Sequence, residues 1–251
     1  MNRRAYITVI ALTATALGCG INAEHEQASM KVLMEAAENC DLNRFTAEMA
    51  KGFDPGRLNR FDGQGVITPL HSAAGKGCTG IVRLLLDHGV KADLRVADDG
   101  SKLAGATPLV FAVLMKHTDA ANLLIDRGAS LNVTYGPVVG PYGRVSLWDL
   151  AVEKDKSLDI VASIMRHDPK RTGQELSDAV ARGLLEDNLP LIETIIRGGY
   201  KPTRLDVMMA VKHKRKDVAS VLLDAMLVGT SPAFGQLQRN SLCPDCPRSH
   251  K

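Results

Sequence analysis

Aromatic residues are scarce in this chain, and their scarcity narrows the fold classes it can adopt. Phe, Trp and Tyr make up 4% of the 251 residues, whereas 45% are hydrophobic, mainly Leu, Ala, Val, Ile and Met. Such side chains favour helices packed side by side over a sandwich of sheets. A chain of this length also has enough of them to bury a core. We therefore expect an all-α protein.

An excess of charge of one sign is also lacking. The chain has 31 Lys and Arg against 28 Asp and Glu. Loss of an N-terminal leader that contains Arg3 and Arg4 leaves 29 against 28, a net charge of about +1. A near-neutral chain has no basic stripe for phosphates, so we expect no nucleic-acid partner.

Patterns typical of catalysis or cofactor binding are missing as well. There is no G-x-S-x-G, no H-E-x-x-H and no phosphate loop, and the seven histidines are scattered. Gly75–Gly80 spells G-x-G-x-x-G, but it follows an expected helix, whereas a dinucleotide site needs a strand before the glycines. We expect no enzyme, no cofactor and no bound metal.

Hydrophobic runs of membrane-spanning length are absent too, and the apolar run Ala5–Gly18 follows two cations. It is too short for a permanent span, so we interpret residues 1–19 as a signal peptide. Ala16-Leu-Gly-Cys19 resembles the lipobox of bacterial lipoproteins, which implies lipidation of Cys19 and a periplasmic protein anchored to the outer membrane. Cleavage after Ala23, which yields a soluble periplasmic protein, and an uncleaved anchor are the alternatives.

What the sequence does contain is a short motif that recurs along it. Thr68–Ala74 (TPLHSAA) is echoed at Thr107–Val113 and Ser146–Val152, and more faintly before Ala181 and at Met208–Val211. A second apolar stripe follows each copy. Thr caps a helix, Pro suits its first turn, and Gly89 and Gly128 stand where left-handed caps end a second helix. Each copy therefore predicts a helix-turn-helix unit.

The tetrapeptide Thr68-Pro-Leu-His71 and the endings Leu84–Gly89 and Leu123–Ala129 resemble the ankyrin-repeat family. The resemblance covers roughly residues 30–229 and is weakest from residue 146 onward. It implies an ankyrin-repeat solenoid of about six units, with His71 in a hydrogen-bond network between the tetrapeptides of adjacent repeats. Tandem helical repeats of another family are the alternative.

Spacing indicates where the repeats are enlarged. The anchoring alanines are 37, 39, 39, 30 and 29 residues apart, against about 33 in ankyrin repeats. These alanines are Ala36, Ala73, Ala112, Ala151, Ala181 and Ala210. Helices and tight turns cannot lengthen without disrupting the stack, so the first three units carry long finger loops, which commonly form a binding face.

The fingers span residues 55–66, 91–106 and 132–144, and they carry the residue types that dominate protein interfaces. We expect partner contacts from Arg57, Arg60, Phe61, Arg95, Lys102, Tyr135, Tyr142 and Arg144. In the alternative, Phe61 and the finger valines fold back onto the stack and leave only charged tips exposed.

Four cysteines remain once Cys19 is set aside, and in an oxidising compartment they can form disulfides. Cys40 and Cys78 lie in neighbouring inter-helix turns on the same rim, so they are candidates for a disulfide across the two repeats. The difficulty is that stacked helices are roughly 10 Å apart, whereas a bridge needs Cα atoms within about 7 Å. Two free, half-buried cysteines are the alternative. Residues 230–251 lose all periodicity and read as a flexible tail. There, Cys243 and Cys246 suit a small disulfide loop, half of a metal site with His250, or thiol exchange.

These features together predict a non-catalytic protein-binding module of a bacterial envelope that touches membrane only through an N-terminal lipid. An immunity protein that neutralises an antibacterial effector, such as a lipase-like toxin, is the favoured hypothesis, by analogy of fold. The alternatives are a periplasmic accessory protein in oxidative-stress defence, and a thiol-redox or metal-handling protein that acts through Cys243 and Cys246.

Overall fold

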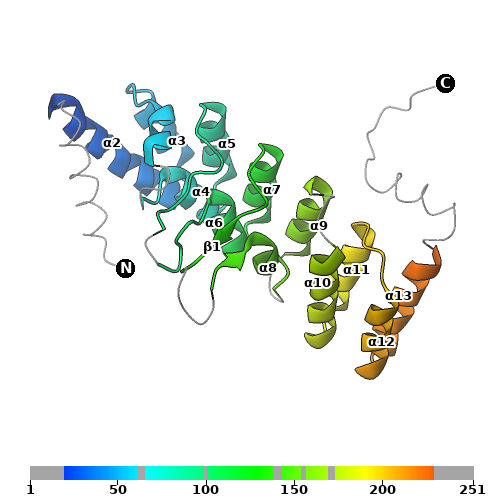
Figure 1. Cartoon of the computed structure of the whole chain (residues 1–251). Coiled ribbons are helices and arrows are strands. Elements are labelled where there is room, and N and C mark those ends of the chain that lie inside the picture. The colour runs from blue at the N-terminus through cyan, green and yellow to red at the C-terminus, as the bar shows by residue number, and fades with distance from the viewer. Residues whose placement is uncertain are drawn as a thin grey trace, which may run out of the picture. The chain divides into compact units, whose positions relative to one another are not determined.

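A computed structural model (Figure 1) describes residues 20–61, 66–98, 101–137, 143–153, 157–168 and 173–228. The expected signal peptide with Cys19 and the expected tail with Cys243 and Cys246 lie outside these residues. The chain divides into two compact units, Met1–Ala151 and Val152–Lys251. Among the described residues, no helix is both long enough and apolar enough to cross a membrane.

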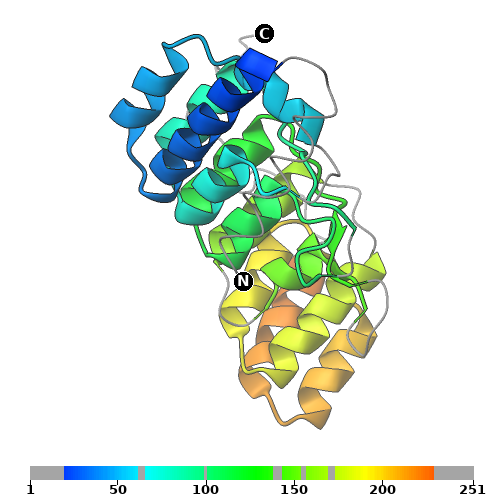
Figure 2. The same cartoon turned by 90° about the vertical axis from the view of Figure 1, so that its left-hand side faces the viewer.

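The first unit stacks three helix pairs, with the fingers between them. Its elements are α2 (Gly20–Glu38), α3 (Leu42–Met49), the 3₁₀ helix η1 (Pro55–Phe61), α4 (Pro69–Lys76), α5 (Thr79–Asp87), α6 (Pro108–Leu114), α7 (Thr118–Asp126), β1 (Thr134–Tyr135), β2 (Val145–Ser146) and α8 (Leu147–Ala151). The first helices α2, α4 and α6 lie side by side, and the second helices α3, α5 and α7 form a parallel row (Figures 1 and 2). Helix α8 continues the first row beside α6.

The second unit continues with short connections. It contains α9 (Leu158–His167), α10 (Gly173–Leu185), α11 (Leu189–Arg197), α12 (Arg204–Lys212) and α13 (Lys216–Val228). Here α10 packs beside α12, and α11 packs between α9 and α13. With α8 and α9 counted as the fourth pair in sequence order, the described residues form six helix pairs. Only the first three pairs are followed by long connections, at residues 50–68, 88–107 and 127–146. The all-α solenoid with three long fingers is thus confirmed.

Five of the inter-helix turns have the same geometry, which identifies the anchor of each of these repeats, while the turn between α8 and α9 lies partly outside the described residues. One residue adopts a left-handed conformation, and the next backbone N–H donates to a carbonyl five residues earlier, as Cys78 does to Ala73 at 2.8 Å. The left-handed residues are Cys40, Gly77, Lys116, Asp187 and Lys214. This is the hydrogen bond that closes a helix ending in a left-handed residue.

The fifth anchor is Gly183 and not Ala181, which corrects the spacing inferred from sequence. Asn188 N–H donates to the Gly183 carbonyl at 2.7 Å, as Cys78 does to Ala73. A Cβ on Gly183 lies 2.9 Å from the Ile192 side chain, so the close packing of α10 on α11 there favours glycine. The last two spacings become 32 and 27 residues.

A row of large apolar residues three positions before the anchors forms the core of the first-helix layer. Leu33, Leu70 and Leu109 are fully buried there, and Trp148 takes the same position in α8 with 4% of its surface exposed. Burial of each such side chain contributes roughly 1.5–3 kcal/mol. The indole at position 148 therefore serves as a core residue. Gly89 and Gly128 end α5 and α7 with positive φ, as predicted.

Candidate protein-binding site

The second finger folds back on itself and buries its apolar residues. Val96 N–H donates to the Ala106 carbonyl at 3.0 Å, and Gly105 N–H donates to the Val96 carbonyl at 3.1 Å. Leu94 and Val96 are buried beneath this turn, while Arg95 and Lys102 are exposed. The alternative in which apolar finger residues return to the stack therefore describes this finger, whose exposed charged residues include Arg95, Lys102 and Asp98.

His71 fixes the base of the second finger. Its Nδ1 accepts the Thr68 backbone N–H at 3.2 Å and lies 2.9 Å from the Thr68 hydroxyl, while Nε2 lies 3.0 Å from the Leu94 carbonyl. A ring with its proton on Nε2 satisfies all of these partners. The ring is fully buried and meets Phe111 of α6 edge-on, with centroids 5.2 Å apart. His71 is thus structural, and it links the helix start of α4 to the second finger and to the next repeat.

The third finger is joined to the second through its backbone. Thr134 and Tyr135 of β1 pair antiparallel with Val145 and Ser146 of β2. Beside this ladder, Gly136 N–H donates to the Ala104 carbonyl of the second finger at 2.9 Å. The described parts of the two fingers therefore form one surface, which we call the finger platform: residues 94–98 and 101–106 of the second finger, with 132–137 and 143–146 of the third.

Side-chain contacts also connect the fingers to one another and to the repeats. Arg144 on the third finger forms an ion pair with Asp98 on the second. The first finger is tied in at its base, because the Asn59 side chain donates to the Gly89 carbonyl at 3.0 Å and accepts the Lys91 N–H at 2.8 Å. The next repeat uses Asp93 in the same way, with Ser130 N–H as its donor at 2.8 Å. Side chains at the finger bases thus hold the three long loops in register.

Tyr135, one of the residues expected to contact a partner, is buried in the structure, with 8% of its surface exposed. The cause is strand pairing: side chains alternate between the two faces of a strand, so the exposed Thr134 leaves Tyr135 directed inward. The third finger is therefore anchored by the tyrosine and does not present it.

The other predicted contact residues fall into two groups. Arg95, Lys102 and Arg144 are exposed on the finger platform. Arg57, Arg60 and Phe61 lie on η1, but their side chains, like the whole of Tyr142, lie outside the described residues. Leu58, between the two arginines, is fully buried and anchors η1 to the stack.

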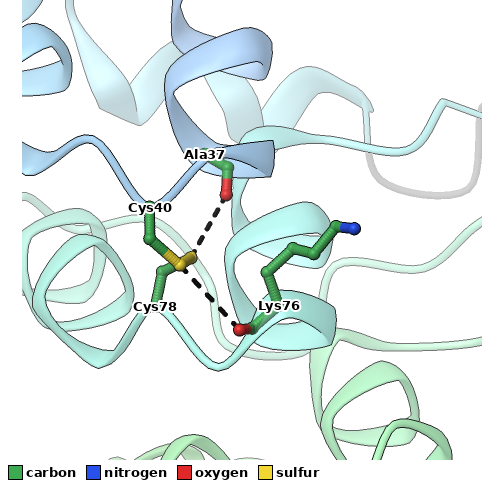
Figure 3. Close-up of a disulfide and its surroundings, with 4 residues drawn as sticks. All are labelled: Ala37, Cys40, Lys76 and Cys78. Atoms are coloured by element: carbon green, nitrogen blue, oxygen red, sulfur yellow. Dashed lines mark hydrogen bonds between the residues drawn. A yellow bond between two sulfur atoms is a disulfide. The ribbon is translucent and has the colours of Figure 1, made fainter.

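Cys40 and Cys78 are joined by a disulfide that links the first two repeats (Figure 3). Their Cα atoms are 5.1 Å apart, far closer than the helix spacing suggests. The reason is that both residues lie at turn corners, where the left-handed Cys40 projects toward the following turn. The two sulfurs also lie near backbone carbonyls, Cys78 Sγ at 3.2 Å from Ala37 O and Cys40 Sγ at 3.8 Å from Lys76 O.

The same pair of turn positions is in contact at other places in the array. We call it the turn pair: the left-handed residue of one repeat and the residue after the left-handed residue of the next. Gly77 and His117 form such a pair, and a Cβ on Gly77 lies 2.5 Å from the His117 ring. In the second unit the turn pair is Asp187 and Arg215, which form an ion pair.

Sequence reasoning missed a buried carboxylate at the start of α12. Asp206 accepts hydrogen bonds from the Tyr200 hydroxyl at 2.7 Å, the Thr203 N–H at 2.7 Å, the Thr203 hydroxyl at 2.8 Å and the Ser177 hydroxyl at 2.9 Å. Burial raises the pKa of Asp206, but these hydrogen bonds outweigh it and the pKa lies below its usual value. Burial, with the neighbouring carboxylate, raises the pKa of Tyr200 to about 12. Thr203 and Asp206 form a capping box, so the spelling T-x-x-D was the available signal.

Within the described ranges, no cluster of His, Cys, Asp and Glu could hold a metal ion. The most developed surface features there are the finger platform and the turn pairs.

Comparison with known proteins agrees with this architecture. The family described as ankyrin repeats (3 copies) matches residues 33–135, so the first unit carries ankyrin repeats. One chain of a solved complex superposes with a TM-score of 0.53 at 23% identity, over 77% of this chain and 97% of that chain. That complex is the Bd0816 predatory endopeptidase from Bdellovibrio bacteriovorus with the immunity protein Bd3460. At this identity the likeness shows the fold.

No curated protein sequence matches the chain. Ankyrin repeats suggest protein–protein interaction.

Proposed function

We propose that this protein binds another protein through the finger platform and does not catalyse a reaction. The observation that carries the proposal is the backbone link between the two fingers, the Gly136 N–H to Ala104 carbonyl bond. Because these contacts hold the described parts of the two fingers in place before binding, those parts lose little conformational entropy when a partner docks. Long loops that are hydrogen-bonded to one another and to the helix stack are typical of a binding surface.

The charge of the platform indicates the kind of surface it recognises. Arg95 and Lys102 are exposed cations on the second finger, and Arg144 adds a third whose charge is partly balanced by Asp98. A partner with an acidic surface around a concave site matches this arrangement, since complementary charge speeds encounter and selects the partner. Arg57, Arg60, Phe61 and Tyr142 extend the proposed contact surface.

We further propose that the partner is an enzyme that attacks the cell envelope, so that this chain acts as an immunity protein. The support is the similarity of fold to a chain from a complex of an endopeptidase with an immunity protein. A lipase-like effector, the class expected from sequence, and a peptidase are both enzymes whose active-site cleft a finger could block.

Export to the periplasm, with lipidation at Cys19, is part of this proposal. The leader at residues 1–19 supports it, and so does the Cys40–Cys78 disulfide, because disulfides persist in oxidising compartments. An envelope location puts the chain where an envelope-attacking enzyme acts.

The test is capture of the partner by the chain from residue 20 onward, with cross-linking and mass spectrometry on envelope extracts. We expect wild type to retain one enzyme and Arg95→Glu/Lys102→Glu to bind it at least tenfold more weakly, about 1.4 kcal/mol. The matched control is Arg166→Glu/Lys201→Glu, which reverses two exposed cations of the second unit. Equal retention by the finger variant and the control contradicts the platform as the binding surface.

An activity assay of the purified partner then separates the candidate functions. Stoichiometric inhibition of a lipase or peptidase supports immunity. Capture of a catalase or thiol enzyme that remains active supports the oxidative-stress role. If only Cys243→Ser/Cys246→Ser abolishes capture, the result supports the alternative in which the protein acts through these two cysteines.

A further inference from the structure

The outer face of α12 exposes an apolar row that inner repeats bury. Leu205, Met208 and Val211 have 63%, 67% and 63% of their surfaces exposed. They recur every three residues, so they share one side of the helix. Figure 1 shows α12 and α13 at the C-terminal end of the described chain, with no helix after them there.

Alignment of α12 with α4 of the second repeat shows where the equivalent row of residues lies in an inner repeat. The turn anchors Ala73 and Ala210 differ by 137 residues, as do Cys78 and Arg215. The same shift matches the three exposed residues of α12 with Thr68, His71 and Ala74, all of which are almost completely buried. Helix α6 covers that row in the second repeat, with Phe111 against His71. The face of α12 is therefore one on which a helix normally docks.

Two cations distinguish this face from its inner counterparts. Arg204 and Lys212 precede and follow Met208 by four residues, so they lie along the same line of the helix, one on each side of it. Both are exposed, and the structure records no ion pair for either within the described ranges. The register counterpart of Lys212 is Gly75, where the lack of a side chain admits the Phe111 ring. The uncharged helix α6 packs on the α4 face, which has Gly75 at this position. The α12 face has Lys212 there instead, so its occupant needs acidic groups.

We propose that this face binds an amphipathic helix of another protein that carries acidic residues at both ends of its apolar stripe. Arg204 and Lys212 are eight residues apart, which is about 12 Å along a helix. Two acidic side chains eight residues apart, with apolar residues between them, match that spacing. This second surface is independent of the finger platform.

Charge argues against two other occupants. Residues 229–251 contain Arg239, Arg248 and Lys251 but only one acidic residue, Asp245, so the chain's own C-terminal segment brings like charge. A second copy of the chain, docked face to face, brings the same pair of cations. Like charges placed opposite one another oppose docking in both cases.

The experiment measures binding of designed peptides to the chain from residue 20 onward by fluorescence anisotropy. The probe is a 16-residue helical peptide with Glu at positions 4 and 12, Leu at positions 5, 8 and 11, and Ala or Gln elsewhere. A second peptide has Lys in place of both Glu. We expect the Glu peptide to bind at least tenfold more tightly than the Lys peptide.

Variants locate the site. Met208→Glu should weaken binding of the Glu peptide at least tenfold, while Met115→Glu, which changes a 59% exposed methionine directly after α6, should leave it unchanged. Arg204→Glu/Lys212→Glu should reverse the preference in favour of the Lys peptide. All three changes are at exposed positions, so circular dichroism should be unaltered.

Several results overturn the proposal. Equal binding of the two peptides contradicts the proposed charge preference, and no effect of Met208→Glu contradicts the proposed location of the site. Deletion of residues 229–251 that tightens peptide binding tenfold shows that the tail occupies the face. A dimer that Met208→Glu dissociates assigns it to a second copy, and Met208-dependent binding to phosphatidylglycerol vesicles assigns it to a membrane. None of these outcomes bears on the finger platform.

Discussion

Removal of the Cys40–Cys78 disulfide should lower the stability of the N-terminal repeats by a calculable amount. The bridge joins residues 38 apart in sequence. The chain-entropy expression for a loop of that size gives about 4 kcal/mol at 25 °C. After reduction, the Cys78 thiol can donate to the Ala37 carbonyl at its present distance of 3.2 Å, which offsets part of the loss. We expect a decrease of about 2–4 kcal/mol in the free energy of unfolding.

The measurement is urea denaturation with and without reductant, in a Cys243→Ser/Cys246→Ser background so that only one cysteine pair responds. Hydrogen exchange should place the loss of protection in α2 to α5, because a repeat interacts mainly with its neighbours. The control is Cys40→Ser/Cys78→Ser in the same background, which should be weakened already and should not respond to reductant. A reductant effect below about 0.5 kcal/mol, or one that persists in the control, refutes the reasoning.

Three further predictions follow from single residues. The buried Thr107 hydroxyl has no hydrogen-bond partner in the described part of the chain, whereas the Thr68 hydroxyl contacts His71. In thermal unfolding, Thr107→Val should therefore be neutral or stabilising, and Thr68→Val should lower the free energy of unfolding by about 1 kcal/mol. Gly77→Ala should cost more than 1 kcal/mol in urea, because φ is positive and the new Cβ meets His117. The pKa of Asp206 is lowered on folding, so its stabilisation is present above the unfolded value near 3.8 and is lost as pH falls through the folded one. The denaturation midpoints of wild type and Asp206→Asn should therefore differ at pH 7 and converge below pH 4; a difference that is constant with pH contradicts this account.

Sequence predicted the repeats best where local signals agree with packing. Thr68, Pro69 and His71 each specify the same helix start, and the structure places all three in that role. The fifth repeat was misplaced because its anchor is Gly183, a residue with no side chain to mark it, while Ala181 has the expected residue type two positions earlier.

The finger residues were harder to predict, because burial in a loop depends on pairing with another loop. Tyr135 and Arg144 belong to one loop and are typical interface residues, yet the first is buried by the pairing of β1 with β2 and the second remains exposed. The distance between Cys40 and Cys78 was likewise misjudged from helix spacing, since a left-handed corner brings two turns closer together than the helices they join.

The turn pairs make the two ends of the array responsive to different solution conditions. In the first unit the pair Cys40 and Cys78 is covalent and responds to the redox potential. In the second unit the equivalent pair, Asp187 and Arg215, is an ion pair in which Asp187 is exposed, and salt weakens such contacts by screening. A shift to more reducing conditions therefore weakens the turn pair of the first unit, and a rise in ionic strength weakens that of the second.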